Sequence, residues 1–238
     1  MAKSKYNRVL LKLSGQSFCG PGKTGIESSR LKSLAKRVIE ICKLVPELAI
    51  VVGAGNILRG EAFSKISDIP RHTADYMGML VTIINACALQ ETLEKMGQPT
   101  RVLSAIEVPD ICEKFVRRRA LRHLEQKRVV ILAGGTGNPF FTTDTCAALR
   151  ASEIEADLVI KATKVDGVYS DDPKKNPDAQ LFSSLTYEEV LQKDLKVMDH
   201  SAISLCRNGN IKIVVLNIFK KGNLAKAVSG QQVGTVIS

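Results

Sequence analysis

Short apolar runs and amphipathic stretches alternate along the whole chain. The apolar runs are rich in Val, Ile and Leu, and most of them are continuous instead of alternating with polar residues. This pattern favours strands that are buried on both faces of a largely parallel sheet. The predicted strands cover residues 8–13, 48–52, 100–106, 128–133, 157–163, 211–217 and 234–238.

The stretches between these runs have the periodicity of amphipathic helices. Ser28 and Ser29 are candidate N-caps for the first helix, which is expected to end near Pro46. Another helix begins at Thr142 or Thr143 and continues to about residue 155. The other predicted helices cover residues 73–96, 113–127, 186–194, 199–208 and 222–229, and the clearest loop covers 170–179.

This alternation of strands and helices predicts an α/β fold with helices on both faces of the sheet. Because neither a linker nor a repeat interrupts it, we expect a single domain over residues 1–238. Aromatic residues make up only 5% of the chain and Trp is absent. The core must therefore be built from Val, Ile, Leu and Ala.

No apolar run has the length of a transmembrane helix, and the N-terminal run ends at Lys12, which is too early for a signal peptide. We therefore expect no membrane partner and a cytoplasmic location. The six cysteines lack the spacing of zinc ligands, which indicates buried free thiols in a reducing compartment. The three histidines are scattered, and no set of metal ligands stands out.

The formal net charge is +10, and the basic residues are densest between Lys114 and Arg128. Nucleic acid or small phosphorylated ligands could both account for such an excess. The plainer interpretation is the solvated face of an amphipathic helix. Aromatic residues suited to base stacking do not interleave with the cluster, which disfavours nucleic acid as a partner.

Three glycine-rich turns, over residues 12–25, 52–60 and 133–144, each follow a predicted strand. Glycine lets a ligand approach the backbone closely, and free N–H groups favour anions. Because the carboxyl ends of parallel strands meet at one sheet edge, the three turns predict a phosphate-ligand site there. The common nucleotide motifs are not met, since Ser17 breaks the P-loop pattern and Leu58 breaks the dinucleotide fingerprint.

Charged residues accompany these turns. Lys12 and Lys161 lie within apolar strands, where a charge is costly without an anionic partner. Arg59 follows the second glycine turn, and Asp75 and Asp144 lie near helix starts. Such residue types suit phosphoryl transfer, in which positioning and charge stabilisation provide most of the catalysis.

The segments KLSG, GAGNILRG, DYMGML, GTGNPFFTTD, IEADLVIKATKVDGVYSDDP, LTYEEVL and LKVMD together resemble the bacterial uridylate (UMP) kinases of the amino acid kinase family. The resemblance extends from Arg8 to Ile237. It implies a three-layer α/β/α sandwich around a mostly parallel sheet, transfer of a phosphoryl group from ATP to UMP, Mg²⁺ with ATP, and a homohexamer.

The resemblance also assigns residues to the two nucleotides. The ATP positions are Lys12, Leu13, Ser14, Gly15, Gly55, Arg59, Thr163, Tyr169 and Asp172. The UMP positions are Ala54, Asp75, Thr136, Gly137, Asn138, Pro139, Phe140, Phe141, Thr142 and Thr143. The catalytic candidates are Lys12, Arg59, Asp144 and Lys161, with Asp199 as a weaker one.

The chain departs from the family pattern at two places. Ala54 stands where the family usually has glycine, at a position whose backbone meets UMP. Gln90 and Glu94 replace basic residues that bind the activator GTP in many members, and only Arg101 fits. Whether GTP is an effector therefore stays open.

Two alternatives to a UMP kinase stay open. One is another phosphotransferase of the family, acting on a carboxylate or a carbamate; the uridylate-type segment GTGNPFFTTD argues against it. The other is a non-catalytic relative that binds anions or nucleic acid. Retention of Lys12, Asp144 and Asp172 argues against that loss of catalysis.

Overall fold

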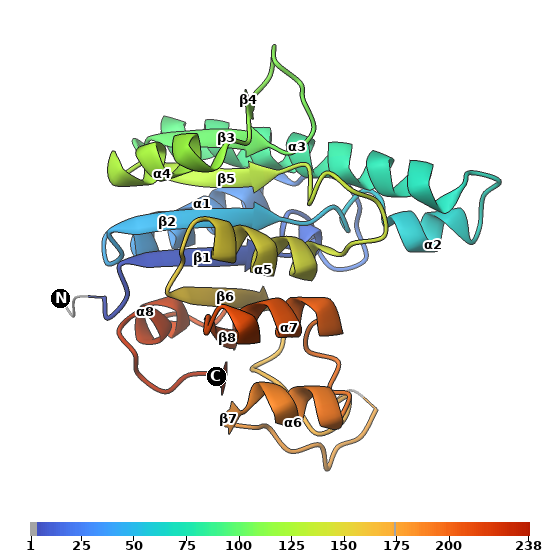
Figure 1. Cartoon of the computed structure of the whole chain (residues 1–238), viewed down its shortest axis with the longest axis vertical. Helices are drawn as coiled ribbons and strands as arrows, with labels where there is room; N and C mark the ends of the chain where they lie inside the picture. Colours follow the sequence, from blue (N-terminus) through green and yellow to red (C-terminus); the bar gives the residue numbers. More distant parts are fainter. Residues whose placement is uncertain (1–3, 174) are drawn as a thin grey trace.

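The computed structural model describes residues 4–173 and 175–238 and forms one sheet of nine strands (Figure 1). The strand order is β4-β3-β5-β2-β1-β6-β8-β9-β7, and only the β8–β9 pairing is antiparallel. The predicted, mostly parallel sheet is thus confirmed. The strands are β1 (Arg8–Leu13), β2 (Glu47–Val52), β3 (Thr100–Ser104), β4 (Glu113–Lys114), β5 (Val129–Ala133), β6 (Leu158–Thr163), β7 (Ser184–Leu185), β8 (Lys212–Asn217) and β9 (Thr235–Ile237).

Helices cover both faces of this sheet and complete the expected α/β/α sandwich. They are α1 (Ser28–Cys42), α2 (Gly60–Ser64), α3 (Arg71–Lys95), α4 (Arg117–Glu125), α5 (Thr143–Glu153), α6 (Tyr187–Gln192), α7 (His200–Asn208) and α8 (Asn223–Val228), with a 3-10 turn η1 (Gly15–Ser17). One apolar cluster packs α1, α3 and α8 on one face, and a second packs α4 to α7 on the other. In Figure 1, α5 and α7 lie in front of the sheet and α1 lies behind it.

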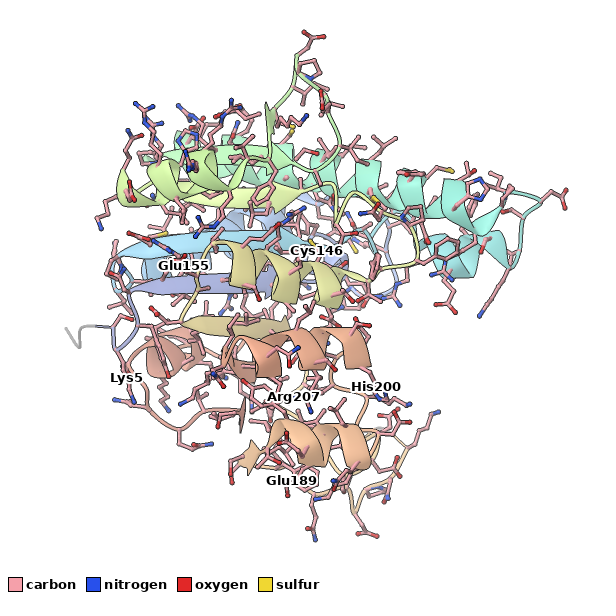
Figure 2. All side chains as sticks on the ribbon, viewed as in Figure 1. Lys5, Cys146, Glu155, Glu189, His200 and Arg207 are labelled. Atoms are coloured by element: carbon pink, nitrogen blue, oxygen red, sulfur yellow. The ribbon has the colours of Figure 1, made fainter. Side chains whose placement is uncertain are left out.

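The central strands contribute side chains to both clusters, as their continuous apolar sequence predicts. In β1, Val9 and Leu11 belong to the first cluster, whereas Leu10 belongs to the second. Since side chains alternate along a strand, Lys12 shares the face of Leu10, the one covered by α5 and α7. Cys146 on α5 and His200 and Arg207 on α7 mark these two neighbouring helices in Figure 2.

Several boundaries differ from the predictions. The helix predicted over 113–127 begins only at Arg117, because residues 113–114 pair with β3 as β4. Ser28 and Ser29 are not N-caps: the N-cap position is occupied by Glu27, and no side-chain hydrogen bond closes that end. The pattern also missed η1, α2 and β7, which are too short to develop a periodicity.

The predicted loop over 170–179 leads from β6 toward β7 and is closed by an isolated bridge between Tyr169 and Leu181; Lys174 lies outside the described residues. Within the described ranges, no helix combines the length and apolarity needed to cross a membrane. All six cysteines are free thiols, and burial raises the pKa of Cys206 to about 12.

Candidate active site

The three glycine-rich turns meet at the carboxyl ends of the central strands, around a cavity of about 680 Å³. Ser14 and Gly15 line it from the turn after β1, and Ala54, Gly55 and Arg59 line it from the turn after β2. The turn after β5 adds Thr136, Phe141, Thr142, Thr143 and Asp144, and α3 adds Arg71 and Asp75. The predicted convergence of the turns on one sheet edge is therefore present.

Two lysines and one carboxylate form the floor of this cavity. Lys12 and Lys161 are register partners on the neighbouring parallel strands β1 and β6. Lys12 Nζ lies 3.0 Å from Asp144 Oδ1, and Lys161 Nζ lies 2.8 Å from Asp144 Oδ2. Lys161 also donates a hydrogen bond to the carbonyl of Val197. Each lysine in an apolar strand thus has the anionic partner that its position requires.

Burial acts against the ionised form of Asp144, but the attraction of Lys12 and Lys161 outweighs it and lowers the pKa of this carboxyl below its ordinary 3.8. For Lys161, burial is the largest effect, and it lowers the pKa of the ammonium group despite the nearby Asp144. The two lysines and the carboxylate are therefore strongly coupled at the cavity floor.

This arrangement predicts a specific pH dependence of stability. Because folding lowers the pKa of Asp144, its ion pairs contribute fully above about pH 4 and are lost as the pH falls further. The difference in unfolding free energy between the wild type and Asp144→Asn, measured by urea denaturation, should be constant from pH 7 to about 4 and shrink below that. A difference that shrinks between pH 7 and 5 would instead indicate a raised pKa.

The first two turns touch each other directly, which only glycine permits. A Cβ on Gly15 would lie 2.7 Å from Asn56 Oδ1 and 2.8 Å from the carbonyl carbon of Ala54. The methyl group of Ala54 itself causes no strain, because this residue is not among those with a positive φ. The departure from the family's glycine is thus compatible with the backbone.

A buried pair of asparagines, which the sequence analysis missed, fixes these turns. Asn56 Nδ2 donates to Asn85 Oδ1 at 2.9 Å, and Asn85 Nδ2 donates back to Asn56 Oδ1 at 2.8 Å. The remaining donors go to the carbonyls of Gly25 and Gly53. The one available signal was a polar residue, Asn85, inside the apolar stretch of the helix predicted over 73–96.

We expect Asn85→Asp to destabilise the fold by about 3 kcal/mol or more, because it places an unpaired charge in the core and removes both amide donors. Urea denaturation measures this free energy of unfolding. The matched control is Asn208→Asp at an exposed position of α7, which should cost less than about 1 kcal/mol. Equal losses in the two variants would contradict a special role for the asparagine pair.

The opposite wall of the cavity is organised by Asp75 and the loop before α5. Asp75 Oδ2 accepts a hydrogen bond from the backbone N–H of Phe140 at 2.9 Å. Phe140 has a φ of 69°, a left-handed conformation that is strained for a side chain of this kind. Thr142 caps α5 by accepting from the N–H groups of Asp144 and Thr145.

Asp199 has a structural connection to this wall and does not line the cavity. Its Oδ1 accepts from Thr145 Oγ1 at 2.7 Å and from Ala202 N at 2.9 Å, and its Oδ2 accepts from Thr142 Oγ1. It therefore joins the N-termini of α5 and α7.

Some predicted nucleotide residues lie elsewhere. The side chain of Leu13 is fully buried in the core, and its carbonyl accepts from Gly53 N–H, so it shapes the turn instead of lining the cavity. Thr163 ends β6, and its hydroxyl lies within hydrogen-bond distance of the carbonyls of Val165 at 2.6 Å and Leu216 at 3.1 Å. Tyr169 and Asp172 follow in the loop beyond β6. Gly137, Asn138, Pro139 and Phe140 form the outer part of the loop after β5.

Gln90, Glu94 and Arg101 stand at the positions that bind GTP in many family members. Arg101 forms an ion pair with Glu94 at 2.7 Å. Gln90 Oε1 accepts a hydrogen bond from Val102 N–H. Among the described residues, no three His, Cys, Asp or Glu side chains gather in a metal-binding group.

Comparisons with known proteins agree with this geometry. The amino acid kinase family model matches residues 7–217. The chain is similar to the curated protein Uridylate kinase PUMPKIN, chloroplastic, from Arabidopsis thaliana, at 53% identity over 233 residues, which cover 98% of this chain and 69% of the relative.

Solved structures of UMP kinases are similar as well. The enzyme from Bacillus anthracis has a TM-score of 0.93 at 36% identity, covering 98% of this chain and 96% of its own. The enzyme from Ureaplasma parvum has a TM-score of 0.90 at 36% identity, with both chains covered completely. Uridylate kinase from Archaeoglobus fulgidus has a TM-score of 0.74 at 30% identity, covering 97% of this chain and 99% of its own.

Proposed function

This chain belongs to the amino acid kinase family, and from that premise we propose how it works as an ATP-dependent UMP kinase, which transfers the γ-phosphoryl group of ATP to UMP and yields ADP and UDP. The observation that carries the proposal is the pair of lysines joined by Asp144 beneath three glycine-rich turns. No comparison favours the carboxylate or carbamate kinase or the non-catalytic relative.

Lys12 and Arg59 stabilise the negative charge of the transferring phosphoryl group, and the N–H groups of Gly15 and Gly55 donate hydrogen bonds to phosphate oxygens. Asp144 holds Lys12 and Lys161 in place, so the positive charges are positioned before the substrates arrive. Such preorganised charge is the main source of catalysis in phosphoryl transfer. The adenosine of ATP extends toward Thr163, Tyr169 and Asp172 at the end of β6.

Mg²⁺ fits this site as a partner of ATP. Asp144 is the carboxylate that would hold the ion, because it lines the cavity and its buried Oδ1 has only the ion-pair contact with Lys12 and no aligned hydrogen bond among the described residues. A single carboxylate suits Mg²⁺, which is usually ligated mainly by substrate phosphates and water. The ion would offset charge on the transferring phosphates.

UMP occupies the opposite wall, between Ala54, Asp75 and the loop over Thr136 to Thr143. Asp75 accepts hydrogen bonds from the ribose hydroxyls, and the loop surrounds the uracil. We also propose that the whole chain acts as one kinase domain and assembles as a homohexamer. The exposed apolar stripe Tyr76, Leu80 and Ile84 on α3 supports burial of that face between copies.

The remaining partners and the location stay predictions. The pairing of Arg101 with Glu94 makes this arginine less available to a GTP phosphate. Arg117 is likewise paired with Glu155, and Arg119 with Glu113. These ion pairs partly neutralise the basic cluster on α4, which argues against nucleic acid as a partner. The sequence favours the cytoplasm, whereas the Arabidopsis relative is chloroplastic.

The function is tested by measuring ADP formation from ATP and Mg²⁺ with UMP, CMP, dUMP and TMP in parallel. We expect UMP to give the highest kcat/KM, and dUMP to be poorer because Asp75 loses a hydroxyl partner. Thermal shift with UMP and with amino acids separates the UMP kinase from other phosphotransferases of the family. Absence of turnover with UMP would overturn the proposal.

A further inference from the structure

Arg71 lines the cavity wall beside Asp75, apart from the two lysines and Asp144. It begins α3, and its Nε–H lies 2.9 Å from both carboxylate oxygens of Asp75. Its guanidinium carbon is 5.8 Å from the centre of the Phe140 ring. The same carboxylate accepts the backbone N–H of Phe140, so one arginine and one carboxylate connect α3 to the loop before α5.

Helix energetics alone do not explain this pair. Residues four apart lie on one helix face, but the favourable order places the acid before the base. Here the arginine stands in the first turn, where the helix dipole favours an acidic residue, and the first turn of α3 contains none. The pair therefore contributes little to helix stability in this order, and its place in the cavity wall points to a role at the site.

The Asp75 carboxylate is enclosed tightly. Its side chain is only 12% exposed, and a Cβ on Gly60 would lie 2.9 Å from the Asp75 backbone. A nearly buried carboxylate next to an anionic nucleotide is repelled by the nucleotide's phosphate unless a cation offsets its charge. Arg71 is the cation in ion-pair contact with it.

We propose that Arg71 is a positioning residue for UMP. It fixes the orientation of Asp75, offsets the charge of that carboxylate and, through Asp75, holds the strained Phe140 in the loop that surrounds the uracil. This inference rests on the proposed UMP kinase function and assigns a specificity role within it. Arg71 acts on the acceptor nucleotide and leaves the ATP side unaffected.

The test is steady-state kinetics of Arg71→Ala with each substrate varied in turn. The KM for UMP should rise about tenfold or more, which corresponds to about 1.4 kcal/mol or more, whereas the KM for ATP should stay within about twofold. Arg71→Lys keeps the charge and should recover part of the loss. The control Arg118→Ala, at an exposed position of α4 outside the cavity, should change neither constant.

A double-mutant cycle with Asp75→Asn shows whether Arg71 acts through Asp75. Once Asp75 has lost its charge, adding Arg71→Ala should change the KM for UMP by less than about twofold. If Arg71→Ala still raises the KM for UMP as much in the Asp75→Asn background, Arg71 contacts UMP itself. If Arg71→Ala alone leaves the KM for UMP unchanged, Arg71 has no role in UMP binding. Either result overturns the inference. UMP binding by calorimetry gives the same answer for a variant with weak turnover.

These outcomes differ from a failure of the proposed function. If the wild type does not phosphorylate UMP, the function itself is wrong, and so is the acceptor role given to Arg71. If the wild type is active and only the Arg71 variants behave unexpectedly, the function stands and the positioning role fails.

Discussion

Replacement of Lys12 by alanine is expected to lower kcat for UMP phosphorylation by about a thousandfold or more, which corresponds to about 4 kcal/mol of transition-state stabilisation. Lys12 stands near the end of β1, beneath the three glycine-rich turns, and its ammonium group is held by Asp144 at 3.0 Å. Its register partner Lys161 does not substitute for it, because Lys161 is turned to Asp144 and the carbonyl of Val197.

The fold should survive this change, since Asp144 keeps Lys161 as its partner. Circular dichroism and urea denaturation check that the variant is folded. Lys32→Ala, on the exposed face of α1, is the matched control and should retain full activity. If Lys12→Ala kept its activity within about tenfold of the wild type, equivalent to about 1.4 kcal/mol, the role proposed for Lys12 would be wrong.

The layout of the sheet follows from the sequence because its central strands are buried on both faces. A largely apolar run such as residues 8–13 fits few positions other than a central strand, because both of its faces need to be buried. The strand predicted there has the same bounds as β1. Strands and helices of only a few residues cannot be predicted in this way. Strand β4 has two residues and exists only because β3 offers its edge, so nothing in residues 113–114 predicted it.

For the site, the sequence predicts which turns converge but not how their side chains pair. Lys12 and Lys161 are recognisable as charges in apolar strands, yet their sharing of Asp144 depends on the β1–β6 register and on the start of α5. Arg71 was missed because an arginine near a predicted helix start gives no sign of its partner. Asn85 was missed for a similar reason, since its partner is 29 residues away.

Removal of the charge on Asp144 is expected to have the second large effect. Neighbouring strands lie about 4.8 Å apart, so without this carboxylate the ammonium groups of Lys12 and Lys161 face each other in a largely buried place. Asp144→Asn should therefore lower kcat by about a thousandfold and the unfolding free energy by about 3 kcal/mol. Both quantities are measured at pH 7, where the wild-type carboxyl is ionised.

A second substitution separates charge repulsion from loss of catalysis. In the Asp144→Asn background, Lys161→Met removes one of the two facing cations and replaces it with an apolar chain of similar length. Much of the lost stability should return, because a buried unpaired charge is what destabilises the single variant. Activity should not return, because Lys12 still lacks the carboxylate that positions it and the catalytic candidate Lys161 is also gone. Recovery of activity together with stability would show that Asp144 serves only to keep the lysines apart.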